Sequence, residues 1–137
     1  MAGAAPIPED RPLTAQESAL VRWMLEQGTP ASTRFIPQLE AAYVVARCPC
    51  GCASVDFSVG RVVPAPGPLS ILADFEYRTA EGHLCGVFVF ERDGLLAGLE
   101  VWSVDGLSTL STLPATSQLQ PLGSVQDAAP ATSTADD

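Results

Sequence analysis

Three cysteines within five residues are the densest concentration of reactive side chains in this chain of 137 residues. They are Cys48, Cys50 and Cys52, in the run Cys-Pro-Cys-Gly-Cys. Thiolates bind zinc and Cu(I), and a thiolate is also the nucleophile of disulfide exchange. The fourth cysteine, Cys85, and the only histidine, His83, are two residues apart further along the chain. The residue types therefore allow a metal site, a redox site or a tight turn of small side chains.

A metal site is the first chemistry that this spacing allows. Its ligands would be Cys48, Cys50 and Cys52, with Cys85 or His83 as a fourth if the strand that starts at His83 lies near the turn. Zinc usually has four thiolate or imidazole ligands, and C-x2-C is its common spacing. The C-x-C-x-C spacing is tighter and less common for zinc, but thiolate-rich runs also suit Cu(I). We expect zinc or copper if the turn binds a metal, and no cofactor otherwise.

Two other interpretations of the cysteines stay open. In a structural one, the proline and glycine of the motif form the turn and the thiols pack as small apolar side chains. In a redox one, Cys50 or Cys52 is a nucleophile, which requires a positive charge or a helix N-terminus nearby. Arg47 adjoins the motif, but strand alternation directs it away from Cys48, and no C-x-x-C motif opens a helix. Cys85 alternates in phase with apolar residues, which predicts a core thiol.

A capped helix is predicted over 14–27. Thr14 and Glu17 fit a capping box, and Gly28 is suited to the C′ position. The apolar stripe of this helix is Leu20, Val21, Met24 and Leu25. A short second helix is expected within 33–40, where a proline limits its length.

After residue 41 the period of the apolar residues changes from 3.6 to 2, which is typical of β-strands. Asp93-Gly94 is a strong hairpin signal between two of the expected strands. Five strands are expected, at 42–47, 53–59, 69–78, 83–91 and 95–104. We predict an α+β fold in which the helices pack on a five-stranded antiparallel meander, largely in sequence order.

The length predicts a single domain. We place it at 13–108, between a disordered N-terminus at 1–12 and a disordered tail at 109–137. Both ends are rich in small residues and proline, and the tail has no aromatic residue. Such segments cannot bury enough apolar surface to offset the loss of chain entropy.

Acidic residues alternate away from the apolar positions of the strands, so they are expected to share one face of the sheet. An acidic face with an exposed aromatic residue is a plausible protein-binding surface, although antiparallel sheets also have ordinary solvated faces. The candidate partner-binding residues are Asp56, Asp74, Glu76, Glu100 and Trp102. Arg78 is expected on the same face.

The net charge is −9, and the seven arginines are spread evenly along the chain and form no basic patch. Both observations argue against nucleic acid as a partner. The negative charge favours a protein partner with a basic surface. A second copy, paired through an edge strand, is the other partner considered. The first ten residues lack the pattern of a signal peptide, and the most apolar run, 84–90, is too short to cross a bilayer. We therefore expect a cytoplasmic protein that has no membrane association and keeps its thiols reduced.

Three segments together resemble a group of small uncharacterised bacterial proteins. They are the run from Leu13 to Gly28, the run Phe35-Ile36-Pro37-Gln38-Leu39, and the segment from Val44 to Phe57 with its cysteine turn. In that group a capped N-terminal helix leads to a hairpin with a C-x-C-G-C-like turn. The resemblance covers about 12–107, and Cys50-Gly51-Cys52 is its most specific part. It implies a type of domain and no activity.

Common catalytic and nucleotide-binding signatures are absent from the sequence, including phosphate loops, H-E-x-x-H and G-x-S-x-G. The leading hypothesis is therefore a small acidic, non-enzymatic interaction module of the toxin-neutralising or adaptor type. The alternative is a zinc or Cu(I) domain built on the cysteine turn. A thiol-dependent redox enzyme is the third hypothesis.

Overall fold

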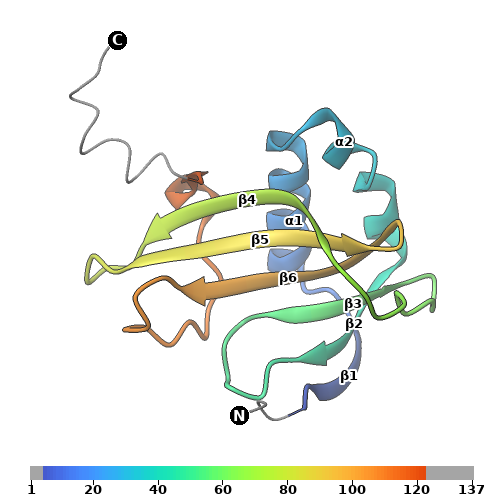
Figure 1. Ribbon diagram of the computed structural model, residues 1–137, viewed down its shortest axis with the longest axis horizontal. Helices are drawn as coiled ribbons and strands as arrows, with labels where there is room; N and C mark the ends of the chain where they lie inside the picture. Colours follow the sequence, from blue (N-terminus) through green and yellow to red (C-terminus); the bar gives the residue numbers. More distant parts are fainter. Residues whose placement is uncertain (1–4, 123–137) are drawn as a thin grey trace.

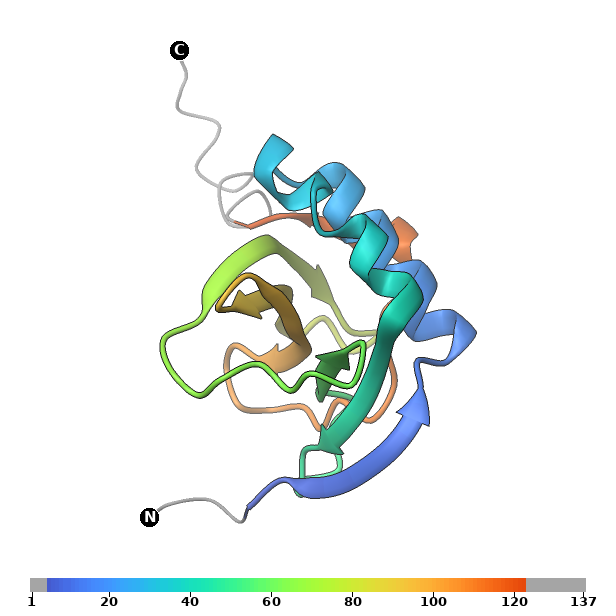
Figure 2. The same cartoon turned by 90° about the vertical axis from the view of Figure 1, so that its right-hand side faces the viewer.

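The computed structural model describes residues 5–122 of the protein (Figure 1). Its strands form one antiparallel sheet in the order β1-β2-β3-β6-β5-β4-β7. Figure 2 shows the helices gathered along one side of this curled sheet. The strands are β1 (Ile7–Pro12), β2 (Ala42–Arg47), β3 (Val55–Val59), β4 (Ser70–Arg78), β5 (Leu84–Arg92), β6 (Leu95–Ser103) and β7 (Gln120–Pro121). The helices are α1 (Ala15–Gln27), α2 (Pro30–Thr33) and two 3₁₀ helices, η1 (Ile36–Ala41) and η2 (Thr116–Gln118). The expected α+β class with an antiparallel sheet is confirmed.

Helix α1 begins at the capping box that the sequence shows. The Glu17 N–H donates to Thr14 Oγ1 at 3.0 Å, and the Thr14 N–H donates to Glu17 Oε1 at 2.8 Å. Two backbone donors at the helix start are thereby satisfied. The apolar side chains of α1 pack on the sheet, where the Trp23 and Phe75 ring centroids are 5.2 Å apart. The short helix expected within 33–40 is instead two pieces, α2 and η1.

The strand order differs from the expected meander. Strands β4, β5 and β6 do form a meander, but β3 pairs with β6, with Val55 opposite Leu99. The meander leaves one edge of β6 without a partner, and β3 covers it. The connection over 60–69 contains three prolines, which cannot donate ladder bonds, so it crosses to the far edge as a loop. Arg92 holds this loop, because its Nε donates to the Gly67 carbonyl at 3.1 Å.

The N-terminal segment corrects a second expectation. Residues 7–12 were expected within the disordered stretch 1–12, but they form β1 along β2, with Ile7 opposite Arg47. Prolines are tolerated on an edge strand because its outer side needs no ladder bonds. Composition could not predict this strand, because its partner edge exists only in the folded sheet. Residues 1–4 lie outside the described part of the chain.

The segment after the last predicted strand is also partly ordered, although 109–137 was expected to be a disordered tail. Leu110 and Leu119 are buried in the core. The Ala53 N–H donates to the Leu110 carbonyl at 2.7 Å, and β7 pairs with β4. Buried leucines and backbone hydrogen bonds therefore attach this polar segment to the core. The rest of that expectation, 123–137, lies outside the described residues.

Candidate functional site

The cysteine turn joins β2 to β3. The Gly51 N–H donates to the Cys48 carbonyl at 3.3 Å, which closes a four-residue turn with Pro49 in its second position. Proline is favoured at that position because its φ is already set. Gly51 has a φ of 91°, a region that favours glycine. The turn therefore places Cys48 and Cys50 at its first and third positions.

The three thiols of this turn form one group. The sulfurs of Cys48 and Cys50 are 2.6 Å apart, and the Cys52 N–H donates to Cys50 Sγ at 3.4 Å. All three sulfurs lie within 4.8 Å of one another. Cys50 is exposed, whereas Cys48 and Cys52 are partly buried and Cys52 packs against the core. The structure thus brings the three sequence-predicted thiol ligands together at the surface.

The hydrogen bonds within the group shift the pKa values of Cys48 and Cys50 in opposite directions. Bonds from Cys48 and then Cys52 lower the pKa of the Cys50 thiol. The bond to Cys50, followed by burial, raises the pKa of the Cys48 thiol. The exposed Cys50 is therefore a stronger acid than Cys48.

The other two predicted metal ligands are not in the group. Cys85 is fully buried on β5, where its Sγ donates to the His83 carbonyl at 3.7 Å. His83 Nδ1 lies 3.0 Å from Ser108 Oγ. Strand β6 lies between β3 and β5, and two strand spacings amount to roughly 9.5 Å. Among residues 5–122, no histidine, aspartate or glutamate joins the three thiols as a fourth ligand.

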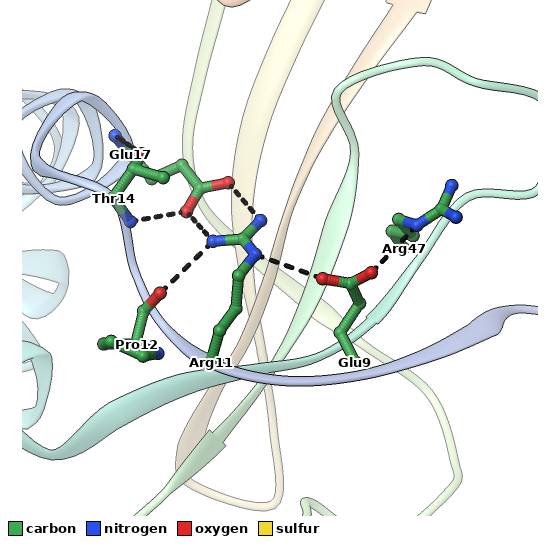
Figure 3. Close-up of polar contacts among 6 residues, drawn as sticks. All are labelled: Glu9, Arg11, Pro12, Thr14, Glu17 and Arg47. Carbon is green, nitrogen blue, oxygen red and sulfur yellow. Dashed lines mark hydrogen bonds and ion pairs between the residues drawn. The ribbon is translucent and has the colours of Figure 1, made fainter.

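A chain of ion pairs connects the cysteine turn to helix α1 (Figure 3). Arg47 Nε lies 2.9 Å from Glu9 Oε2, and Glu9 Oε1 lies 3.1 Å from Arg11 Nε. The Arg11 guanidinium then binds both carboxylate oxygens of Glu17, at 2.9 and 3.0 Å. Arg47, the residue before Cys48, is therefore held by Glu9 on β1, so the base of the turn is tied to the start of the helix.

Sequence reasoning missed Glu9 and Arg11 because their segment was expected to be disordered. One signal was present in the sequence, because Glu9 and Arg11 have opposite charges and are two residues apart. Two opposite charges two residues apart on a strand lie on the same face. That pattern indicates a paired edge strand better than the overall composition does.

A pocket of about 170 Å³ lies beside the turn. Its lining includes Arg47, Cys48, Asp56 and Glu100. Burial raises the pKa of the Asp56 carboxyl, although Arg92 acts in the opposite direction. Burial and then the charge of Asp56 raise the pKa of the Glu100 carboxyl. The thiol group thus adjoins two carboxyls that lie close enough to affect each other.

The predicted partner-binding residues lie on the sheet face opposite α1. The cross-strand rows on β4, β5 and β6 are Asp74–Phe88–Glu100 and Glu76–Gly86–Trp102. Asp56 joins them from β3, and Arg78 follows Glu76 on β4, where it donates to the Gly82 carbonyl at 2.8 Å. Trp102 is 39% exposed, whereas Glu76 is 2% exposed, so part of this face is accessible to solvent and part of it is buried.

Gly86 leaves the space beside its backbone that the Trp102 ring occupies. A Cβ at Gly86 would stand 2.4 Å from Trp102 Nε1, a distance that real side chains do not adopt. Asp74 lies in the neighbouring row, and its Oδ1 is buried without a hydrogen-bond partner among the described residues. Burial, and then the charge of Glu76, raise the pKa of the Asp74 carboxyl. The face therefore combines an aromatic surface with carboxyls that are costly to ionise.

Comparison with known proteins gives no relative that would indicate a role. No family model, no curated protein and no solved structure matches the chain. Within residues 5–122, no helix has the length and apolar character needed to cross a bilayer.

Proposed function

We propose that this is a small metal-binding protein whose cysteine turn holds one zinc or Cu(I) ion through Cys48, Cys50 and Cys52. The observation that supports the proposal is the grouping of three sulfurs within 4.8 Å of one another on an accessible turn. Soft thiolates select zinc and Cu(I) over magnesium or calcium. Three thiolate ligands therefore favour a soft ion such as Cu(I), or zinc.

The spacing of the sulfurs suits one shared ion. Two thiolates that bind zinc at about 2.3 Å in a tetrahedral site are roughly 3.8 Å apart. The Cys48 and Cys50 sulfurs, now 2.6 Å apart, would open by about one ångström, which small χ1 rotations allow. Cu(I) accepts three thiolates, whereas zinc would take a fourth ligand from solvent or from a partner. An open position on an exposed turn favours an exchangeable ion over a structural one.

Metal titration tests this proposal. Reduced, chelator-treated, full-length protein is titrated with Zn²⁺ or Cu(I) in competition with a chromophoric chelator. We expect one equivalent per chain, with binding lost in the Cys50→Ser and Cys52→Ser variants. Cys85→Ala is the matched control, because its thiol is outside the group, and it should retain one equivalent. Binding that is not stoichiometric, or that survives Cys50→Ser unchanged, would rule the proposal out.

An interaction module of the toxin-neutralising or adaptor type is a second candidate function. The observation that favours it is the exposed Trp102 on an acidic sheet face, in a chain of net charge −9. Aromatic residues are enriched at the centres of protein interfaces, and the charge favours a basic partner. Co-purification from the native host tests it. A stoichiometric basic partner should be recovered with the wild-type protein and lost with Trp102→Ala, and a partner bound equally by both would contradict this assignment.

Self-association through an edge strand is a separate proposal for the partner. Strand β1 lies at one edge of the sheet, and the two-residue β7 covers only part of β4 at the other edge. Edge strands with unpaired backbone groups are templates for pairing. Light scattering on the full-length protein should give twice the monomer mass if the pairing is stable. The monomer mass at high concentration would exclude it.

A further inference from the structure

We propose that Cys48 and Cys50 form a thiol–disulfide couple that exchanges with small disulfides, with Cys50 as the attacking thiol and Cys48 as the resolving thiol. This activity goes beyond metal binding, because it requires no ion and uses only two of the three thiols.

Accessibility decides the order in which the two thiols react. Cys50 is exposed at the tip of the turn, so an incoming disulfide reaches it first. Cys48 is partly buried at the base of the same turn, and its sulfur lies 2.6 Å from Cys50 Sγ. Cys52 packs its side chain against the core and gives Cys50 a backbone N–H bond. The contact and the packing together favour Cys48 as the resolving thiol.

The backbone permits the bond between these two residues. A disulfide requires Cα atoms within about 7 Å. Residues two apart span at most roughly 7 Å when extended, and a closed turn brings them nearer. The Gly51 N–H bond to the Cys48 carbonyl closes this turn without involving either sulfur. A Cys48–Cys50 bond therefore forms without unfolding the hairpin, and bonds across so short and exposed a loop are typical of labile couples.

The thiol–disulfide exchange takes place in two steps, first at Cys50 and then at Cys48. The Cys50 thiolate attacks one sulfur of the disulfide RS–SR, a Cys50–SR bond forms, and RS⁻ leaves with the electron pair of the broken bond. The Cys48 thiolate then attacks the Cys50 sulfur, the Cys48–Cys50 bond forms, and the second RS⁻ leaves. The two protons lost by the cysteines are taken up by the two leaving thiolates. Two protein thiols are oxidised, and the small disulfide is reduced to two thiols.

Cystamine is the probe chosen for this reaction. It is a small cationic disulfide, and a chain of net charge −9 attracts cations. Reduced full-length protein in excess chelator is mixed with cystamine, quenched with acid at intervals, and examined by intact mass and by peptide mapping. For the wild-type protein we expect loss of the mass of two hydrogens, no lasting cystamine adduct, and a mapped Cys48–Cys50 bond.

Variants separate the two roles and keep the test decisive. Cys48→Ser should accumulate one stable adduct on Cys50, Cys50→Ser should lose the fast reaction, and buried Cys85 should stay unmodified in every case. A lasting adduct on the wild-type protein, or a mapped Cys50–Cys52 bond as the main product, would overturn the proposal. Far-UV circular dichroism verifies that each variant is folded.

The Cys52→Ser variant distinguishes this couple from the metal site. It removes one of the three metal ligands, so it should lose metal binding, yet it should still form the Cys48–Cys50 bond and leave no lasting cystamine adduct. If metal binding fails in all forms of the protein but the bond forms, only the metal proposal is wrong. If metal binds but the bond does not form in chelated protein, only the couple is wrong.

Discussion

Arg11 on β1 binds the Glu17 carboxylate of helix α1 through two bonds, of 2.9 and 3.0 Å. The Glu17 side chain is 8% exposed and also accepts the Thr14 N–H, so one carboxylate serves the helix cap and the edge strand together. Through Glu9, the same arginine is connected to Arg47 at the base of the cysteine turn. The position of the turn therefore depends on a strand that the composition of its segment does not predict.

Removal of Arg11 should destabilise the fold. Arg11→Ala leaves Glu17 largely buried without its charged partner, which we expect to lower the free energy of unfolding by about 1–3 kcal/mol. Urea denaturation followed by circular dichroism measures the change. Arg22→Ala is the matched control, because Arg22 is exposed on α1, and it should change the stability by less than about 0.5 kcal/mol. Equal effects of the two substitutions would show that the ion pair contributes nothing to stability.

The stability contribution of Glu17 should depend on pH. Burial alone raises the pKa of this carboxyl, but the bonds from Arg11 and Thr14 outweigh it and lower the pKa below the usual glutamate value. The unfolded state then binds more protons between the two pKa values, so stability rises with pH there. The contribution is complete above about pH 4.3, the unfolded value, and is lost as the pH falls through the folded value. The stabilities of wild type and Glu17→Gln should differ most above the unfolded pKa and converge as the pH falls through the folded pKa. Parallel curves would contradict this assignment.

The pH dependence of the stability contribution of Asp74 should be opposite to that of Glu17. Its pKa is raised by burial and then by Glu76, so the folded state favours the protonated carboxyl and stability falls as the pH rises through the folded pKa. Asp74→Asn should therefore stabilise the protein at pH 7, by up to about 1 kcal/mol, and have little effect at pH 3. Asp10→Asn, at an exposed position on β1, is the charge-matched control. Destabilisation by Asp74→Asn at pH 7 would show that the carboxylate has a partner that stabilises it.

Gly86 should resist substitution because of Trp102. Gly86→Ala puts a Cβ 2.4 Å from the indole, so we expect the ring to move and the free energy of unfolding to fall by about 1–3 kcal/mol. The tryptophan fluorescence maximum should shift to the red as the Trp102 ring becomes more exposed to solvent. In Gly86→Ala combined with Trp102→Ala the clash is absent, so the alanine at 86 should then cost much less, and a double-mutant cycle measures the coupling. Additive effects would show that the ring adapts without strain.

Metal removal should leave the protein folded. Helix α1 and the sheet bury their core without the cysteine turn, and of the three thiols only Cys52 packs against that core. We therefore expect chelated protein to keep its circular dichroism spectrum and a cooperative melt. Added zinc should raise the Tm in a concentration-dependent way, because the ion binds the folded state. Loss of the spectrum on chelation would identify a structural ion instead.

The sequence predicts features whose causes are local. The capping box at Thr14 and Glu17, and the alternation that places Asp74 and Glu100 opposite the core, involve neighbours within a few residues. The crowding of three cysteines around one proline and one glycine is likewise visible in the chain itself. Backbone sterics, capping bonds and side-chain period act over such short separations, so they can be predicted without knowledge of the fold.

Tertiary structure decides which of these elements meet. Pairing of β3 with β6 separates Cys85 and His83 from the thiol group, although the sequence allowed either as a fourth ligand. The pairing of β1 with β2 and the burial of Leu110 and Leu119 give order to segments whose composition predicts disorder. The free energy of these contacts comes from surfaces that exist only after the rest of the chain has folded. For that reason the composition of these segments could not predict that they are ordered.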